Sequence, residues 1–280
     1  GEARDHVDIT LTPDDKKVAV AIGDPADIWI IDLERDTSTR FTFDPGSDDA
    51  PCWSPDGKEL LFQSSRIIPG RRFTPANLYR KAASGLEQEV YLPTDDYGSS
   101  LYPMSWSPDG STLGVSALNA KTGADILFYS FETGDFQVYL DTPADEETPR
   151  FSPDGRWLAY SSTETGTKEV YVTAYPGSGG KWQVSNGGGE MPQWRADGRE
   201  LFYTTKDEDM MAVSVETEEV FRHGTPVKLF TAPSLLRIGS NFSWDVTSDG
   251  ERFIFLAPVD EGRVGAGEVT LVQGWRELLE

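Results

Sequence analysis

The residues best suited to chemistry in this sequence are acidic side chains that precede a recurring aspartate by seven or eight positions. They are Asp48, Asp49, Glu146, Glu147 and Glu190. Carboxylates that crowd together raise one another's pKa or require a cation. If the recurring aspartates mark a structural repeat, these five carboxylates come from three equivalent places in the fold and converge on one rim.

Three interpretations of this acidic group stay open. A solvated acidic rim is the simplest, because a wide hydrated mouth screens charge and the sequence has no calcium-loop motif. Bound Ca²⁺ is the second, with Asp48, Asp49, Glu146, Glu147 and Glu190 as its hard oxygen ligands; no other cofactor is required. A partner that presents Lys or Arg is the third. Its contacts would be Asp49, Tyr97, Tyr102, Glu147, Glu190 and Phe242, which combine charge with residue types common in binding hot spots.

Groups suited to other kinds of catalysis are sparse. The two histidines, His6 and His223, lie far apart in the sequence, and no Gly-x-Ser-x-Gly nucleophile motif occurs. We therefore predict a binding protein rather than an enzyme. The alternative is a metal-dependent polysaccharide lyase or hydrolase that would act through the same acidic group.

An internal repeat indicates which elements position these residues. A turn motif related to Ser-Pro-Asp-Gly recurs about every 40 to 50 residues, which is a period typical of repeat folds. Its aspartates are Asp14, Asp56, Asp109, Asp154, Asp197 and Asp249. Pro presets φ, Asp bonds its own backbone and Gly accepts a positive φ, so the motif predicts a tight turn between two strands.

Hydrophobic strands flank each turn, and four short strands per repeat are typical of a propeller blade. The pattern predicts short fourth strands at residues 40–43, 89–92, 137–140, 182–184 and 227–230. We predict an all-β, six-bladed β-propeller of four-stranded antiparallel blades, forming a single domain over residues 1–280. The repeats lie near residues 6–43, 48–92, 101–140, 146–185, 190–230 and 241–280. The last repeat offers three strands, so either its blade is three-stranded or a segment upstream completes it.

Composition narrows the classes of partner. The chain carries 47 acidic and 25 basic residues, for a net charge of −22, which would repel the phosphates of nucleic acid. No apolar run approaches the roughly 18 residues of a membrane span, so we expect no membrane insertion by this chain. Cys52 is the single cysteine, which excludes an intrachain disulfide, and we expect it to be buried.

Two of the repeats carry a family resemblance. Trp53-Ser54-Pro55-Asp56-Gly57 and Phe151-Ser152-Pro153-Asp154-Gly155, each followed by hydrophobic strands, resemble the TolB-type, WD40-like propeller repeat, and the likeness covers nearly the whole chain. The stretch from Phe151 to Trp194 resembles propellers attached to bacterial Ser/Thr kinases. The resemblance implies a periplasmic or other extracytoplasmic sensor or scaffold that belongs to a larger polypeptide or complex.

Strand direction in such a fold predicts the working face. The Asp-Gly turns would all lie on one face, whereas the loops that connect successive blades would lie on the opposite face, together with the acidic group. Binding usually uses variable loops on a rigid scaffold. We therefore expect a protein or peptide partner, with a basic one favoured, to dock there at the mouth of the central channel.

Overall fold

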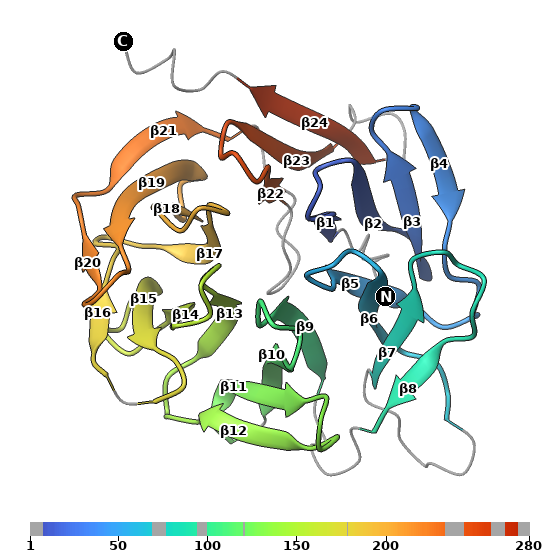
Figure 1. Cartoon of the computed structure of the whole chain (residues 1–280), viewed down its shortest axis with the longest axis horizontal. Coiled ribbons are helices and arrows are strands. Elements are labelled where there is room, and N and C mark those ends of the chain that lie inside the picture. The colour runs from blue at the N-terminus through green and yellow to red at the C-terminus, as the bar shows by residue number, and fades with distance from the viewer. Residues whose placement is uncertain are drawn as a thin grey trace. The chain divides into compact units, whose positions relative to one another are not determined.

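The computed structural model of the chain describes residues 8–68, 77–93, 100–119, 121–177, 179–232, 244–258 and 267–273 (Figure 1). Every regular element in this part of the chain is a β-strand, and no described segment forms a helix long and apolar enough to cross a membrane. Tyr97 and Phe242, and the terminal segment 274–280, lie outside the described residues.

The fold is an all-β propeller whose blades are four-stranded antiparallel sheets. In four of these sheets each strand pairs with the next one along the chain. They comprise β1 (Ile9–Leu11), β2 (Lys17–Gly23), β3 (Ala26–Asp32) and β4 (Thr37–Arg40); β5 (Asp48–Trp53), β6 (Glu59–Ser64), β7 (Asn77–Ala82) and β8 (Val90–Leu92); β9 (Leu101–Trp106), β10 (Thr112–Asn119), β11 (Gly123–Ser130) and β12 (Phe136–Leu140); and β13 (Glu146–Phe151), β14 (Trp157–Ser162), β15 (Glu169–Ala174) and β16 (Lys181–Gln183).

The fifth sheet has a divided outer edge. It contains β17 (Glu190–Trp194), β18 (Glu200–Thr204) and β19 (Asp209–Glu216), and both β20 (Arg222–His223) and β21 (Val227–Thr231) pair with β19. We expected a single fourth strand over 227–230. Pro226 stands between the two short strands, and a proline has no N–H to donate to the ladder, so the edge is divided there.

The last described sheet has three strands, β22 (Trp244–Val246), β23 (Arg252–Pro258) and β24 (Gly267–Gln273), in that order. The first blade also departs from its predicted outline. Its outer strand is β4, ending at Arg40, and not the expected 40–43. The N–H groups of Phe41 and Thr42 both donate to the carbonyl of Ile28, and this sharing takes the two residues out of the regular ladder.

The repeat turns have the geometry that their sequence predicts. In the second blade, Ser54 Oγ donates to Asp56 Oδ1 at 2.8 Å and accepts from the N–H of Glu59 at 2.9 Å. Gly57 has a φ of 67°, a backbone conformation that would be strained for a residue with a side chain. Equivalent hydroxyl-to-aspartate bonds occur in four other blades, at Thr12–Asp14, Ser107–Asp109, Ser152–Asp154 and Thr247–Asp249. The recurring aspartates therefore hold turns.

The chain divides into two compact units. The first consists of Gly1–Pro103, Ser234–Asp245 and Ile254–Leu271, and the second of Met104–Pro233, Val246–Phe253 and Val272–Glu280. The core of the first unit includes Trp53, Phe62 and Ile28, which belong to its first two sheets and pack face to face. Cys52 is buried, as expected. The prediction of one domain over residues 1–280 stays a prediction.

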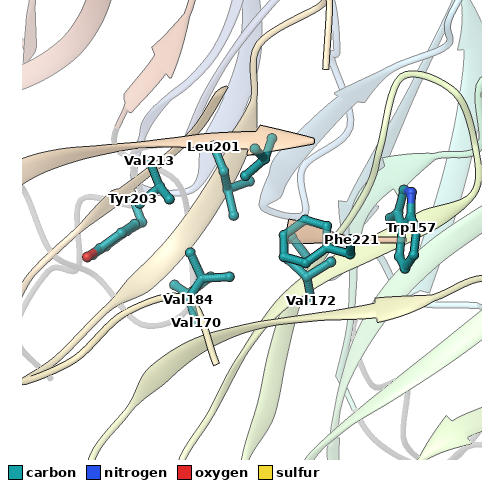
Figure 2. Packing of buried hydrophobic residues seen from close by; sticks show 10 residues of the cluster. Trp157, Val170, Val172, Val184, Leu201, Tyr203, Val213 and Phe221 are labelled. Carbon is teal, nitrogen blue, oxygen red and sulfur yellow. The ribbon is translucent and has the colours of Figure 1, made fainter. Parts of the chain in front are cut away.

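Aromatic and β-branched side chains also fill the core of the second unit (Figure 2). Val170 and Val172 of β15 lie in one cluster with Leu201 and Tyr203 of β18. Phe221 packs in the same cluster, and its ring centroid lies 5.5 Å from that of Trp157. Sheets that stack in this way bury both faces of their middle strands, which explains why β14 is buried at every position.

Candidate functional site: acidic residues at the blade bulges

The first strands of three blades carry a bulge at the same place. Each bulge consists of an acidic residue, a residue with positive φ and a proline: Asp49-Ala50-Pro51, Glu147-Thr148-Pro149 and Glu190-Met191-Pro192. The central residues have φ values of 49°, 57° and 57°, in the left-handed region that non-glycine residues seldom enter. Bulges redirect side chains and interrupt the ladder. Here the bulge fixes where the preceding carboxylate lies.

The bulge leaves one backbone N–H without a partner in its own sheet. In each case a side chain of the preceding blade accepts a hydrogen bond from it. The pairs are Ala50 N to Asp8 Oδ2 at 2.7 Å, Thr148 N to Ser116 Oγ at 2.9 Å and Met191 N to Ser161 Oγ at 3.2 Å. Serine is the acceptor twice, and it carries no charge. Only the first of these pairs places a carboxylate beside the acidic residue of the bulge.

The first unit therefore contains two neighbouring buried carboxyl groups. Asp8 and Asp49 are 3% and 8% exposed. Burial and the charge of Asp49 raise the pKa of Asp8 well above its usual range. Burial, followed by the charge of Asp48, raises the pKa of Asp49 to about 7. Within the described residues, Oδ1 of each carboxyl group is buried and has no hydrogen-bond partner.

Tyr102 and Gln63 complete this group, which we call the Asp8 site and define by Asp8, Asp49, Gln63 and Tyr102. Gln63 on β6 lies opposite Asp49 on β5, and its side chain lies near the phenol of Tyr102. Burial raises the pKa of the Tyr102 phenol, and the charges of Asp49 and Asp8 raise it further. The two carboxyl groups and the phenol therefore face one another closely enough to interact.

Asp48, next to Asp49, is held by an internal cation instead. Arg66 Nη2 contacts both carboxylate oxygens of Asp48 at 3.0 Å, and its Nη1 pairs with Glu89. The guanidinium also stacks over the ring of Tyr79, with Cζ 4.2 Å from the ring centroid. Asp48 is fully buried, and burial raises its pKa although Arg66 acts in the opposite direction. This pair is a structural one.

The second unit also supplies a cation to its acidic bulge residues. Lys168, on the loop between β14 and β15, places Nζ 2.5 Å from Glu147 Oε2 and 3.9 Å from Glu190 Oε2. One ammonium thus serves the carboxylates of two successive blades. Glu146 is treated differently: it is 2% exposed, accepts a hydrogen bond from Thr142 Oγ1, and has its pKa raised chiefly by burial.

The structure divides the predicted site residues between two groups. Asp48, Asp49 and Tyr102 belong to the first unit, and Glu146, Glu147 and Glu190 to the second. Four of the five carboxylates are buried and not displayed on a solvated rim, and Glu190 is half-buried. Among the described side chains, no three His, Cys, Asp or Glu residues lie where they could share a metal ion. Binding of Ca²⁺ and convergence of all five carboxylates on one rim stay predictions.

Sequence reasoning missed Asp8 and Lys168. Counting back seven and eight residues from Asp14 gives His6 and Val7, neither of which is acidic. Asp8 stands six residues before Asp14, as Ala50 stands six before Asp56. Its signal was an aspartate at the position of the repeat that is equivalent to Ala50. Lys168 carried no comparable signal, because its role depends on how a loop folds over two blades.

No family model matches the sequence. An uncharacterised peptidase of Bacillus subtilis, YuxL, is 29% identical over 177 residues, which cover 61% of this chain and 23% of the peptidase. An uncharacterised protein of Agrobacterium fabrum, Atu1656, is 23% identical over 164 residues, covering 46% of this chain and 56% of that protein. The chain thus spans less than two thirds of either relative.

Solved structures give a closer match in fold than in sequence. A protein assigned as TolB from Agrobacterium tumefaciens superposes with a TM-score of 0.66 at 17% identity, over 81% of each chain. TolB from Acinetobacter baumannii gives 0.70 at 16% identity, over 93% of this chain and 62% of TolB. An oligogalacturonate lyase of Vibrio parahaemolyticus gives 0.61 at 15% identity, over 95% and 76%.

Identities this low establish the architecture alone, and they agree with the repeat turns and the antiparallel blades. Relatives of the same architecture include proteins described as a lyase and a peptidase, so the fold by itself assigns no activity. The chain is a β-propeller structurally similar to the propellers of TolB proteins.

Proposed function

We propose that this chain is a six-bladed propeller that binds a basic protein or peptide partner and does not catalyse a reaction. The observation that carries the proposal is the contrast among the buried carboxylates. Asp48 and Glu147 pair with Arg66 and Lys168, whereas Asp49 has no ion pair with any described residue. A buried carboxyl group without a counter-charge favours a positively charged ligand once it has released its proton.

The arrangement supports binding better than chemistry. The described histidine, His223, is exposed and bonds the adjacent carbonyl of Gly224, away from the acidic residues. The Asp8 site offers acceptors and a phenol with a raised pKa but no described nucleophile–base pair. The peptidase relative matches this chain over 23% of its own length, so its activity need not reside in the shared region. We therefore assign a recognition role.

The family likeness and the net charge support a proposal about the partner and the location of the chain. Similarity to TolB propellers supports an extracytoplasmic location, with this chain acting as a sensor or scaffold within a larger polypeptide or complex. A net charge of −22 attracts basic partners and repels nucleic acid. The three-stranded sheet β22–β24 supplies the sixth blade of the proposed ring.

A peptide panel tests the proposal directly. The chain is titrated, by isothermal calorimetry at physiological ionic strength, with peptides that carry one or two basic residues. Scrambled peptides of the same net charge serve as controls. We expect saturable one-to-one binding that depends on sequence as well as on charge. Absence of saturable binding by every peptide up to about 1 mM, a range where even weak recognition is detected, would contradict the proposal.

A further inference from the structure

We propose that the Asp8 site is a receptor for a single lysine side chain of the partner, whose ammonium enters between Asp8 and Asp49. The inference rests on the proposed binding function and names the group that is recognised. It is carried by three independent features of the described residues: unfilled buried acceptors, an internal example of the same pairing, and the geometry left free on Asp8.

The first feature is a pair of buried carboxylate oxygens that lack a hydrogen-bond partner. Oδ1 of Asp8 and Oδ1 of Asp49 are both buried without a hydrogen-bond partner in the described residues. Buried carboxylate oxygens are costly unless they are paired or hydrogen-bonded, and native structures contain few exceptions. An ammonium group has three donors. The two Oδ1 atoms and the phenol oxygen of Tyr102 would supply three acceptors for it.

The second unit shows an ammonium in the equivalent environment. Lys168 Nζ lies between Glu147 and Glu190, which occupy the same bulge position as Asp49 in their own blades. The fold therefore satisfies such a carboxylate pair with a lysine where the chain provides one. Within the described part of the first unit, the Asp8 site has no corresponding lysine, and a partner would supply it.

The single carboxylate oxygen that Asp8 has left for a ligand favours lysine over arginine. Its Oδ2 already accepts from the amide of Ala50 at 2.7 Å, which leaves one oxygen for a ligand. A guanidinium binds best when it faces both oxygens of one carboxylate, as Arg66 faces Asp48. Separate single oxygens on two residues suit a compact point charge. Because both carboxyl groups are deeply buried, that charge must arrive on a long, narrow stem.

The same features argue against a metal ion as the occupant. Ca²⁺ takes about six to eight oxygen ligands. Asp8, Asp49 and Tyr102 offer fewer, and no described set of three His, Cys, Asp or Glu side chains is placed to hold a metal. An ammonium needs the smaller number of acceptors that the site provides.

The test uses one peptide that binds the wild-type chain and four versions of it, with lysine, Nε-acetyl-lysine, arginine or norleucine at the same position. We expect the lysine peptide to bind more than about tenfold more tightly than each of the others, because an unpaired buried charge is costly. The acetyl-lysine comparison requires no change to the protein, so it cannot fail through misfolding. Equal binding of the lysine and norleucine peptides, or of the lysine and arginine peptides, would overturn the inference.

Protein variants then locate the contact. Asp49→Asn should remove the preference for lysine over norleucine, and Asp8→Asn should reduce it while keeping an acceptor for Ala50. Asp56→Asn is the matched control, because Asp56 is an exposed turn aspartate of the same unit, and it should leave the preference unchanged. A preference that persists in Asp49→Asn would overturn the receptor but leave the binding function standing. If no peptide binds the wild-type chain, the proposed function fails instead.

Discussion

The carboxylate of Asp8 accepts a 2.7 Å hydrogen bond from the backbone amide of Ala50, the residue that follows Asp49. This bond joins the first two blades and brings two buried carboxyl groups together. The equivalent bonds in the second unit use serine hydroxyls, which satisfy the same amide without adding charge. A carboxylate at this point satisfies the amide and also brings a second acidic group beside Asp49.

Folding stability should decrease with rising pH through the Asp8 site. The pKa of Asp49 is about 7 in the folded chain and near 3.8 when unfolded, so the folded state holds a proton that the unfolded state releases between these values. Relative to wild type, Asp49→Asn should therefore gain up to about 4 kcal/mol between pH 4 and pH 8, at about 1.36 kcal/mol per pKa unit. Urea unfolding at several pH values measures the difference.

A turn aspartate provides the control of opposite sign. Hydrogen bonds, first of all with Lys58, lower the pKa of Asp56 to about 2, so its stabilising contribution is present above pH 4 and is lost as pH falls. Asp56→Asn should therefore lose stability relative to wild type at neutral pH, not gain it. A pH-independent difference between wild type and Asp49→Asn would contradict the assignment of the buried proton.

Binding of a lysine peptide should strengthen with rising pH over the same interval. The site accepts a cation only after Asp49 has released its proton, and its pKa of about 7 places that release near neutrality. We expect affinity to increase by up to about tenfold from pH 6 to pH 8, since each pH unit below the pKa changes the ionised fraction by up to about tenfold. Calorimetry in buffers of different ionisation enthalpy counts the protons released. Affinity that does not change with pH, or that falls, would contradict this linkage.

Removing Arg66 should destabilise the first unit strongly. Arg66→Ala leaves fully buried Asp48 without its counter-charge, and breaking such pairs typically costs about 3–5 kcal/mol. Arg66→Met, which retains most of the packing over Tyr79, separates lost charge from lost contact. The double variant Arg66→Met with Asp48→Asn should recover much of the loss. Strictly additive effects in this double-mutant cycle, measured by urea unfolding, would show that the two side chains are not coupled.

The serine of a repeat turn should be replaceable by threonine but not by alanine. Ser152 Oγ accepts from the N–H of Trp157 at 3.0 Å and donates to Asp154 at 2.6 Å. Ser152→Ala leaves that buried N–H without its hydroxyl acceptor and should cost about 1–3 kcal/mol. Ser152→Thr should be nearly neutral, because Thr12 and Thr247 form the same bonds in other blades. Similar losses in both variants would show that side-chain volume, and not the hydroxyl, is decisive.

The repeat made the blades predictable from sequence. Each Asp-Gly turn and its flanking strands involve residues a few positions apart, so local preferences determine them, and the structure confirms the antiparallel sheets, the turn hydrogen bonds and the burial of Cys52. The end of β4 and the division of the last strand in the fifth sheet were missed. Both depend on hydrogen bonds and a proline at the sheet edge, where pattern alone is a weak guide.

The acidic positions were also found from sequence, but their chemical states were not. Sequence spacing located Asp48, Asp49, Glu147 and Glu190 because the bulge recurs at a constant distance from each turn. Which carboxylate receives Arg66, which receives Lys168, and which faces Asp8 depends on contacts between residues many positions apart. Burial and charge pairing arise only when the blades pack, so tertiary structure alone decided that Asp49, unlike Asp48 and Glu147, has no ion pair with any described residue.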